Sequence, residues 1–155
     1  MHEYQEQLEK VYQKLGKAKQ MVLATSLGGR TTARMMSCVI LDGCFFFQTD
    51  RTFLKYEQMK GNPCVALCFD NIQIEGVASD LGHPLDACNA TFAAAYRQAY
   101  PGSYAAYSSL ETEVLFQVEP ALITWYDYEH HEPVRRILSC KEKTYHEHWP
   151  LGGPH

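Results

Sequence analysis

The sequence predicts a mainly β protein, a six-stranded Greek-key β-barrel that is closed or split and carries flanking helices. Three observations predict this fold. Short segments of alternating apolar and polar residues follow one another, tight turns rich in glycine and aspartate separate them, and only a few stretches show helical spacing. With 155 residues, the chain is long enough to bury a substantial core. We therefore expect residues 1–155 to form a single domain.

The first part of the chain predicts one helix and two strands. Residues 2–19 carry apolar side chains at helical spacing, namely Tyr4, Leu8, Val11, Tyr12, Leu15 and Ala18. A short apolar strand over 21–26 follows, and a glycine turn leads to a second strand over 31–41. Because both faces of this second strand are largely apolar, we expect one face to line the core and the other to cover a partner, a ligand or a helix.

A hairpin turn at 42–43 begins the next unit, since glycine accepts the positive φ that such turns need. The aromatic run over 45–47 is too apolar for an open surface, so it predicts a buried strand. A helix is expected over 51–60. Either Thr49 or Asp50 can cap it, because a side-chain oxygen accepts from the free N–H groups of the first turn.

The second half of the chain predicts further strands and one more helix. Strands over 64–69 and 72–79 are joined by a short turn. Gly76, in the middle of a strand, predicts a bulge or the close approach of another backbone or ligand. The alanine-rich segment 84–100 predicts a helix, and 114–128 predicts a last strand pair or one long strand.

Residues 129–155 are polar and rich in histidine, so we expect a flexible tail or a segment that docks onto a second subunit. The tail offers soft and borderline ligands for a metal ion, namely His130, His131, Cys140, His146 and His148. No flanking pattern fixes their geometry, and we predict no metal site.

Composition and charge exclude several classes of function. A formal net charge of −4 and a pI near 5.9 argue against a nucleic-acid-binding surface. No apolar run approaches the length of a membrane span, and the acidic, amphipathic N-terminus is unlike a secretory signal. We therefore expect a cytoplasmic protein that has neither nucleic acid nor a membrane as a partner.

The cysteines predict no metal or redox motif. None of them forms a Cys-x-x-Cys pair, which removes the main support for a zinc-ribbon or thioredoxin-type site. Most lie in apolar strand segments, so we expect reduced, buried packing residues. They are Cys38, Cys44, Cys64, Cys68, Cys88 and Cys140.

The start of the helix expected over 51–60 is a candidate anion site. Free N–H groups and the positive end of the helix dipole favour negative charge there. Arg51 and Lys55 are four residues apart and share one helix face, and Arg34 on an earlier strand can lean over the same place. With the Thr49 hydroxyl, these groups predict a site for a phosphate monoester. The alternative is a surface helix with two solvated cations.

The order of these features resembles the pyridoxamine 5′-phosphate oxidase-like, FMN-binding split-barrel family. The features are an arginine on a strand, a glycine-turned hairpin, an aromatic run that ends in Gln48-Thr49, a lysine six residues after the threonine, and Asn-Pro before another apolar strand. The resemblance is best over 21–79 and weaker over 114–125. It implies a split barrel that forms a homodimer, with FMN held at the interface by both subunits.

The resemblance also implies contacts to FMN. The strand segment that begins at Arg34 would contact the phosphate and the edge of the flavin ring, and Lys55 matches the basic residue that holds the phosphate. Trp125 and Arg135 resemble a pair that completes the site from the other subunit. Arg51 joins the set through the helix face that it shares with Lys55. The predicted cofactor-binding residues are Arg34, Met35, Met36, Ser37, Gln48, Thr49, Arg51, Lys55 and Trp125.

The resemblance implies a flavin-dependent oxidoreductase, a reductase or an oxidase, of unknown small-molecule substrate, with NADH or NADPH as a candidate electron donor. The Arg-x-His substrate element of true pyridoxamine phosphate oxidases is missing. No side chain is an obvious acid, base or nucleophile, and a flavoenzyme needs none because the cofactor carries the redox chemistry. Catalytic residues therefore stay unassigned. The alternative is a non-catalytic module that binds or stores flavin or heme on the same barrel.

Overall fold

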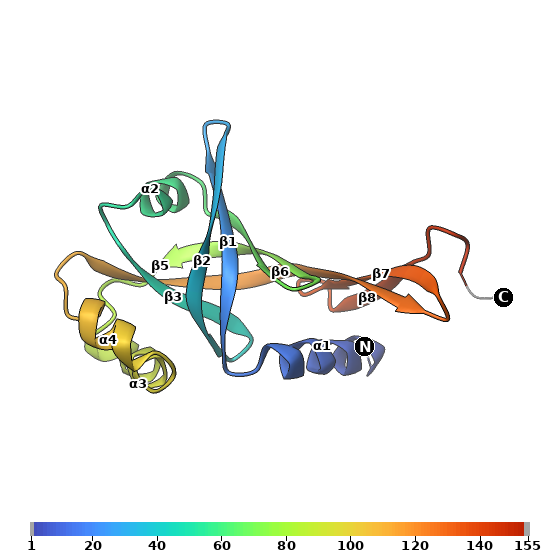
Figure 1. Cartoon of the computed structure of the whole chain (residues 1–155), viewed down its shortest axis with the longest axis horizontal. Helices are drawn as coiled ribbons and strands as arrows, with labels where there is room; N and C mark the ends of the chain where they lie inside the picture. Colours follow the sequence, from blue (N-terminus) through green and yellow to red (C-terminus); the bar gives the residue numbers. More distant parts are fainter. Residues whose placement is uncertain (1, 154–155) are drawn as a thin grey trace.

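Six antiparallel strands close into a barrel in the computed structural model, which describes residues 2–153 (Figure 1). They follow the order β3-β2-β1-β4-β5-β6, and a pairing between β3 and β6 closes the barrel. Their bounds are Ala18–Leu27 for β1, Arg30–Leu41 for β2, Cys44–Asp50 for β3, Cys64–Phe69 for β4, Ile72–Asp80 for β5 and Glu113–Glu129 for β6. The mainly β, split-barrel fold predicted from the sequence is thereby confirmed.

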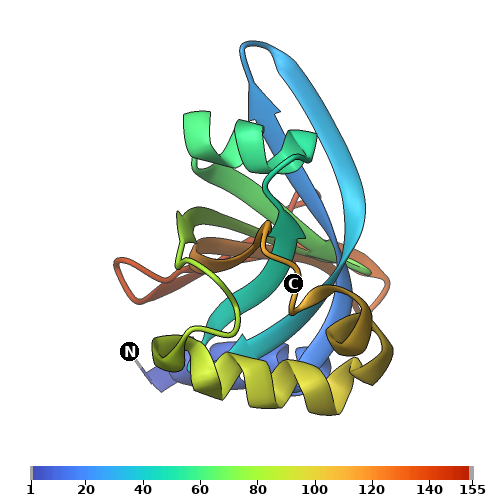
Figure 2. The same ribbon diagram turned by 90° about the vertical axis from the view of Figure 1, so that its left-hand side faces the viewer.

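The barrel is split between β2 and β3. Of the 12 residues of β2, the segment that pairs with β3 is Val39–Leu41, next to the hairpin turn. Beyond it the two strands diverge, as Figure 2 shows, and β3 pairs with β6 instead, up to Asp50 opposite Glu113. The helix α2 (Leu54–Gly61) follows β3 and packs against β1. The first half of β2 thus keeps a free edge near this helix.

The barrel interior holds the main hydrophobic core. Inward-facing side chains of the strands are buried there, the largest being Phe45, Phe47, Phe116, Met21, Leu23, Leu67, Ile72, Ile74 and Ile123. Phe47 and Phe116 stack with their ring centroids 6.0 Å apart. The helix α1 (His2–Leu15) adds its own apolar stripe to this core. None of the helices within residues 2–153 is long and apolar enough to cross a membrane.

A second apolar cluster covers the outside of β3 and β6. Two helices, α3 (Ala90–Ala99) and α4 (Pro101–Tyr107), pack there against these strands and against Val39 and Leu41 of β2, and the short 3₁₀-helix η1 (Ala87–Asn89) precedes them. Phe92 and Tyr96 of α3 are buried on this face. Figure 2 shows the two helices side by side below the barrel. The sequence predicted a single helix here. Pro101 begins a second one instead, because proline suits the first turn of a helix, where no N–H donor is needed.

The last strands form an arm that leaves the barrel. The second half of β6 pairs with β7 (Glu132–Ser139), and β7 pairs with β8 (Thr144–His148), on the right of Figure 1. We define these three paired segments as the arm. The sequence pattern does not predict β7 or β8, since charged residues interrupt their alternation. These two strands form because β7 pairs with β6, β8 pairs with β7, and α1 packs against both.

The predicted cap of the second helix was wrong. The N-cap residue of α2 is Phe53, which has no side-chain capping hydrogen bond. The Asp50 carboxylate accepts instead from the backbone N–H of Thr52 at 2.9 Å and from its hydroxyl at 2.7 Å. This local turn competes with the helix and delays its start to Leu54.

The burial of the cysteines was also predicted wrongly. All six are unpaired, but Cys38 alone among them is fully buried, and Cys64, Cys68 and Cys88 are exposed. The two on β4 point outward because Val65 and Leu67 occupy the inward positions of that strand.

The structure confirms both features predicted at Gly76, a bulge and the close approach of another backbone. The register between β5 and β6 shifts between Glu75 and Gly76, opposite Pro120. A Cβ atom at Gly76 would lie 2.6 Å from the backbone oxygen of Glu119 and 2.7 Å from a methyl carbon of Val118. A bulge and the close approach of a second backbone therefore coincide here.

We expect Gly76→Ala to lower the free energy of unfolding by about 1–3 kcal/mol, because the added methyl group has no room against β6. Chemical denaturation followed by circular dichroism measures this loss. Gly102→Ala is the matched control, since nothing lies within 4 Å of a Cβ atom at that helical position. The control should keep or slightly raise stability, and equal losses in the two variants would contradict the close approach.

Candidate functional site

Arg34 is fixed beneath α2 by hydrogen bonds to neutral groups. Its Nη1 donates to Thr25 Oγ1 at 2.7 Å and to the Leu23 carbonyl oxygen at 3.3 Å, and its Nη2 donates to Thr32 Oγ1. The two threonine hydroxyls in turn donate to Gln58 Oε1 on α2, at 2.6 and 2.8 Å. The guanidinium is therefore oriented without being neutralised, and the same residues tie α2 to β1 and β2.

Lys55, in the first turn of α2, lies close enough to Arg34 for the two charges to interact. Burial lowers the pKa of Lys55, and the positive charge of Arg34 lowers it further, whereas Glu113 and Asp50 raise it. Burial also lowers the pKa of Arg34. Within residues 2–153, neither cation has a carboxylate oxygen within 4 Å. Two partly buried cations that lack a close counter-ion stabilise a bound anion.

The beginning of α2 adds backbone donors to these cations. Its N-cap residue, Phe53, has no side-chain capping hydrogen bond. The N–H groups of the first turn and the positive end of the helix dipole therefore favour a negative charge at this place. We refer to Arg34, Lys55 and the first turn of α2 as the anion site.

Gln48 and Thr49, at the end of β3 that leads to α2, each bury a polar atom without a partner. Their side chains are 7% and 4% exposed, and in the described part of the chain Gln48 Nε2 and Thr49 Oγ1 have no hydrogen-bond partner. Gln48 Oε1 accepts from Ser108 Oγ at 3.0 Å. An unpaired buried donor costs folding free energy. Because successive strand residues point to opposite sides, Gln48 lies on the side of β3 that Leu115 shares and Thr49 on the side that Val114 shares, so a ligand on one side can pair with one of the two atoms.

Glu113, the first residue of β6, is a buried carboxyl that sequence reasoning missed. It is 6% exposed and pairs with Asp50 across β3 and β6. Burial and the Asp50 carboxylate raise the pKa of Glu113 to about 6, while Gln48, Lys55 and His83 act in the opposite direction. A glutamate at the start of an apolar strand usually lies in solvent. Glu113 is buried because segments distant in the sequence pack over it.

The other predicted residues near β2 and α2 lie on different faces. Met36 is buried in the core, whereas Met35 is 59% exposed on the outer face, which Ser37 shares by alternation. Arg51 precedes α2, and its Nη2 donates to the Glu111 carbonyl oxygen at 3.3 Å. Met35 lines an outer groove of about 1040 Å³, together with Val22, Cys68, Phe69 and Tyr100.

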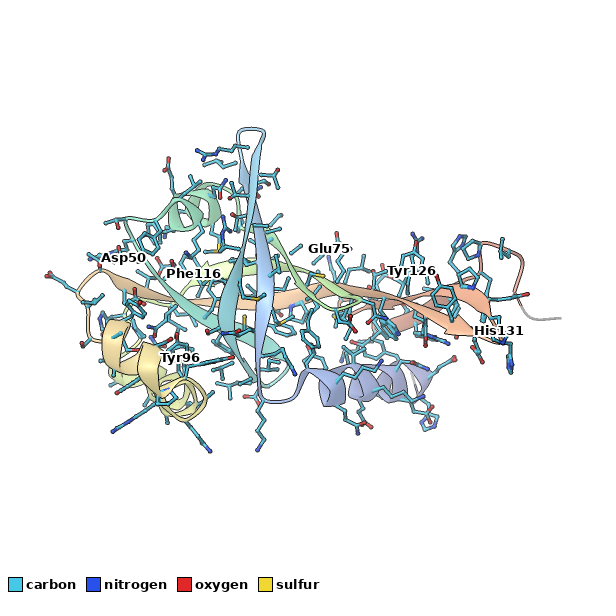
Figure 3. The ribbon with its side chains drawn as sticks, viewed as in Figure 1. Asp50, Glu75, Tyr96, Phe116, Tyr126 and His131 are labelled. Carbon is cyan, nitrogen blue, oxygen red and sulfur yellow. The ribbon has the colours of Figure 1, made fainter. Side chains whose placement is uncertain are left out.

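Trp125 lies apart from the anion site within one chain. It is buried in the arm, with Ile72 and Arg136 as its strand partners. Arg135 pairs with Tyr126 on the opposite face of the arm, and its Nε is buried without a partner in residues 2–153. Figure 3 shows Tyr126 on the arm, at the other end of the molecule from Asp50. The contribution of Trp125 to a site in a second subunit stays a prediction.

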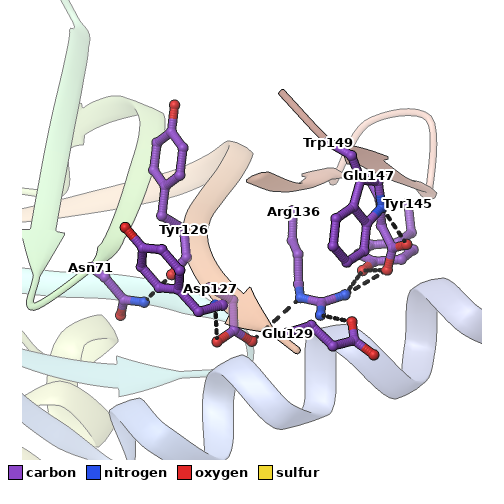
Figure 4. A network of polar contacts seen from close by, with 9 residues as sticks. Asn71, Tyr126, Asp127, Glu129, Arg136, Tyr145, Glu147 and Trp149 are labelled. Atoms are coloured by element: carbon purple, nitrogen blue, oxygen red, sulfur yellow. Dashed lines mark hydrogen bonds and ion pairs between the residues drawn. The ribbon is translucent and has the colours of Figure 1, made fainter. Parts of the chain in front are cut away.

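Arg136 holds the arm together beneath α1. Its guanidinium contacts Asp127 at 3.5 Å, Glu129 at 3.0 Å and the Glu147 carboxylate, and donates to the Tyr145 hydroxyl at 2.7 Å (Figure 4). Burial lowers the pKa of Arg136, but these hydrogen bonds and charges outweigh it and raise the pKa above its usual range. The network gives the arm a fixed shape without using the anion site.

Solved structures share this fold. ChuZ of Campylobacter jejuni aligns with a TM-score of 0.74 and 12% identity, over 100% of this chain and 66% of that one. A pyridoxamine 5′-phosphate oxidase-related, FMN-binding protein of Nostoc punctiforme aligns with a TM-score of 0.61 and 16% identity, over 96% and 94%. HutZ, the heme storage protein of Vibrio cholerae, aligns with a TM-score of 0.61 and 17% identity, over 76% and 89%.

The chain therefore has the split-barrel fold of pyridoxamine 5′-phosphate oxidase-like proteins, and the resemblance seen in the sequence is confirmed at the level of the fold. No protein-family model matches the sequence, and no curated protein matches it. Because structures with this fold are described as FMN-binding in one case and as heme storage in another, the fold leaves the cofactor open.

We expect the stability of wild-type protein to fall, relative to Glu113→Gln, as the pH rises through the interval between 4.5 and about 6. The folded state binds more protons than the unfolded state in this interval, so its advantage disappears above it. The loss should be about 1 kcal/mol, since a tenfold change in acidity corresponds to about 1.4 kcal/mol and solvent screens part of the interaction. Urea denaturation across this pH range measures it.

Glu111→Gln is the matched control for this measurement. Glu111 is exposed, only two residues from Glu113, and lies before β6 begins. Its stability profile should run parallel to that of the wild type. A Glu113→Gln profile that also runs parallel to the wild type would contradict the burial of an uncompensated carboxyl.

Proposed function

We propose that the chain is an FMN-binding flavoprotein that acts as a flavin-dependent oxidoreductase on a small molecule. The observation that carries the proposal is the approach of Arg34 and Lys55, without a close counter-ion, at the first turn of α2. FMN ends in a phosphate monoester, which such a site binds through charge-assisted hydrogen bonds. The shared fold of the FMN-binding protein of Nostoc punctiforme supports this choice of cofactor.

The unpaired Nε2 of Gln48 and Oγ1 of Thr49, one on each side of β3, are the donors that the end of this strand offers to the rest of a flavin nucleotide. An amide N–H and a hydroxyl can donate to ring carbonyl oxygens or to the hydroxyls of the ribityl chain. Met35 and Ser37, on the outer face of β2, would border the ring. When bound, FMN supplies the electron transfer, and the role of these residues is to hold it and to exclude water.

We further propose a cytoplasmic homodimer with the flavin between its subunits. The outer face of β2, β1 and β4 carries small or apolar side chains in adjacent rows, namely Ala33, Met35, Val22, Ala24, Ala66 and Cys68. Such a face favours burial against a second copy. Trp125 and Arg135 of the arm would complete the partner's site, and the unpaired Nε of Arg135 fits that role. Unpaired cysteines suit a reducing compartment.

A heme- or flavin-storage module is the second candidate. HutZ, described as a heme storage protein, shares the fold. On the arm, His146 and His148 are exposed and alternate along β8, so they point to the same side. Imidazole is a suitable ligand for heme iron, and this pair favours heme over other non-flavin cofactors.

We expect Lys55→Ala and Arg34→Ala each to weaken FMN binding by about 10- to 100-fold, since a charge-assisted hydrogen bond contributes about 1.5–3 kcal/mol. Quenching of FMN fluorescence measures the affinity. Riboflavin, which lacks the phosphate, should bind the variants and the wild type equally. Arg51→Ala is the matched control, with a smaller loss, because Arg51 contacts the Glu111 carbonyl oxygen. Unchanged FMN affinity in Lys55→Ala would overturn the phosphate assignment.

Turnover separates the two candidate functions. An oxidoreductase that retains FMN should lose its flavin absorption under NADH or NADPH without oxygen, and an added electron acceptor should restore it. The absorption spectrum of purified protein is the measurement, repeated after FMN or hemin is added and the protein is desalted. Retained flavin that never responds to reductant would support storage. A Soret band without retained FMN would support heme.

A further inference from the structure

Gln58 of α2 is a buried amide whose hydrogen bonds lead to the anion site. It lies one helical turn after Lys55, on the same face of the helix, and is 1% exposed. Its Oε1 accepts from Thr25 Oγ1 at 2.6 Å and from Thr32 Oγ1 at 2.8 Å, and its Nε2 donates to the Arg30 carbonyl oxygen at 3.1 Å. These contacts use both acceptor lone pairs of the amide and one of its two N–H donors.

The Arg30 carbonyl oxygen fixes which way this amide points. A carbonyl oxygen can only accept a hydrogen bond, so the amide atom 3.1 Å from it must be the nitrogen. The amide oxygen of Gln58 must therefore face Thr25 and Thr32, which lie directly opposite each other in the β1–β2 pair. An amide turned over would place two acceptors against each other at Arg30.

The direction of the amide determines how the two threonine hydroxyls bind Arg34. Each hydroxyl has one proton and donates it to Gln58 Oε1, so its lone pairs are left for another donor. The guanidinium can only donate, and it does so to the hydroxyls of Thr25 and Thr32. If the amide nitrogen faced the hydroxyls instead, their protons would turn toward the guanidinium, and donors would face donors.

We propose that Gln58 is the positioning residue of the anion site: its amide makes Thr25 and Thr32 acceptors, and these hydroxyls hold the Arg34 guanidinium in the orientation that binds a phosphate monoester. The inference rests on the anion site of the proposed function. Gln58 acts through the two threonines, whereas Arg34 and Lys55 contact the anion.

The neutrality of Gln58 is as important as its direction. A glutamate at this position would also accept from both hydroxyls, but an ionised carboxylate would bring a negative charge close to Arg34 and weaken the attraction for an anion. It would also lack the N–H that binds the Arg30 carbonyl oxygen. An amide meets both needs, because it accepts on one side, donates on the other and carries no charge.

A second attachment of α2 to β1 separates this role from a purely structural one. Asn62, the C-cap residue of α2, donates from Nδ2 to the Ser26 carbonyl oxygen at 3.0 Å and to the Ser26 hydroxyl at 3.2 Å. Ser26 is not among the groups that accept from Arg34. Asn62→Ala therefore weakens the attachment of the helix without changing the acceptors of the guanidinium, which makes it the matched control.

The readout is the ratio of the affinities for FMN and for riboflavin, which lacks the phosphate, measured by fluorescence quenching. Gln58→Met keeps an unbranched side chain but removes the amide. We expect it to lower this ratio by about tenfold or more, because a misaligned guanidinium loses its charge-assisted hydrogen bond to the phosphate. Asn62→Ala should lower stability and leave the ratio unchanged. If wild type prefers FMN and the ratio is unchanged in Gln58→Met, or falls equally in both variants, the positioning role is overturned.

A second measurement needs no ligand. The ¹⁵N signals of the Arg34 guanidinium, assigned by their loss in Arg34→Lys, are recorded in wild-type protein. Because hydrogen bonds to both Nη atoms hinder rotation of the guanidinium, we expect separate Nη signals that merge in Gln58→Met and persist in Asn62→Ala.

The outcomes distinguish this inference from the proposed function. A single averaged Nη signal in wild type, or separate signals that persist in Gln58→Met, overturns the positioning role and leaves the anion site standing if FMN binds more tightly than riboflavin. If wild type has no preference for FMN and does not bind sulfate, the anion site falls and the inference falls with it.

Discussion

The orientation of Arg34 by neutral oxygen atoms is the constraint on which the rest of the candidate site depends. Two threonine hydroxyls and a backbone carbonyl accept three hydrogen bonds from the guanidinium, which has five N–H donors, and none of them cancels its charge. Because Gln58 accepts from the same hydroxyls, the contacts that orient the arginine also hold α2, and with it Lys55, over the free edge of β2. A carboxylate in place of either threonine would hold the arginine equally well and would remove the reason to bind an anion.

Several groups around this site lower the stability of the folded chain when no ligand is bound. Two cations are partly desolvated near each other, a buried glutamate lies opposite an aspartate, and two donors at the end of β3 lack partners. Each lowers the stability of the unliganded protein. A ligand with a phosphate and hydrogen-bonding groups relieves the repulsion between the two cations and supplies a partner for an unpaired donor. The large core behind β3, with Phe45, Phe47 and Phe116 fully buried, compensates for that loss.

Local chemistry made part of this structure predictable. The turn at 42–43, the aromatic strand after it and the bulge at Gly76 follow from backbone preferences that need no knowledge of distant residues. The predicted start of α2 was wrong because the Asp50 carboxylate accepts a hydrogen bond from nearby Thr52 and does not cap the helix. The arm was missed because β7 and β8 depend on pairing with β6 and on α1. Glu113 was missed for a similar reason, since its burial comes from strands and helices far away in the sequence. The resemblance found Arg34 and Lys55 through their order along the chain, although no local pattern indicates that they approach each other.

The length of β6 lets one strand connect the anion site with the arm. One continuous strand of 17 residues, about 50 Å when extended, begins at Glu113 beside the anion site and ends in the arm (Figure 1). In the proposed homodimer, the arm of each copy belongs to the cofactor site of the other, so damage at the two ends of β6 falls on different sites. A subunit defective in its anion site and a subunit defective in its arm would then complement each other. Their mixed dimer would hold one intact site, built from the sound ends of two defective chains.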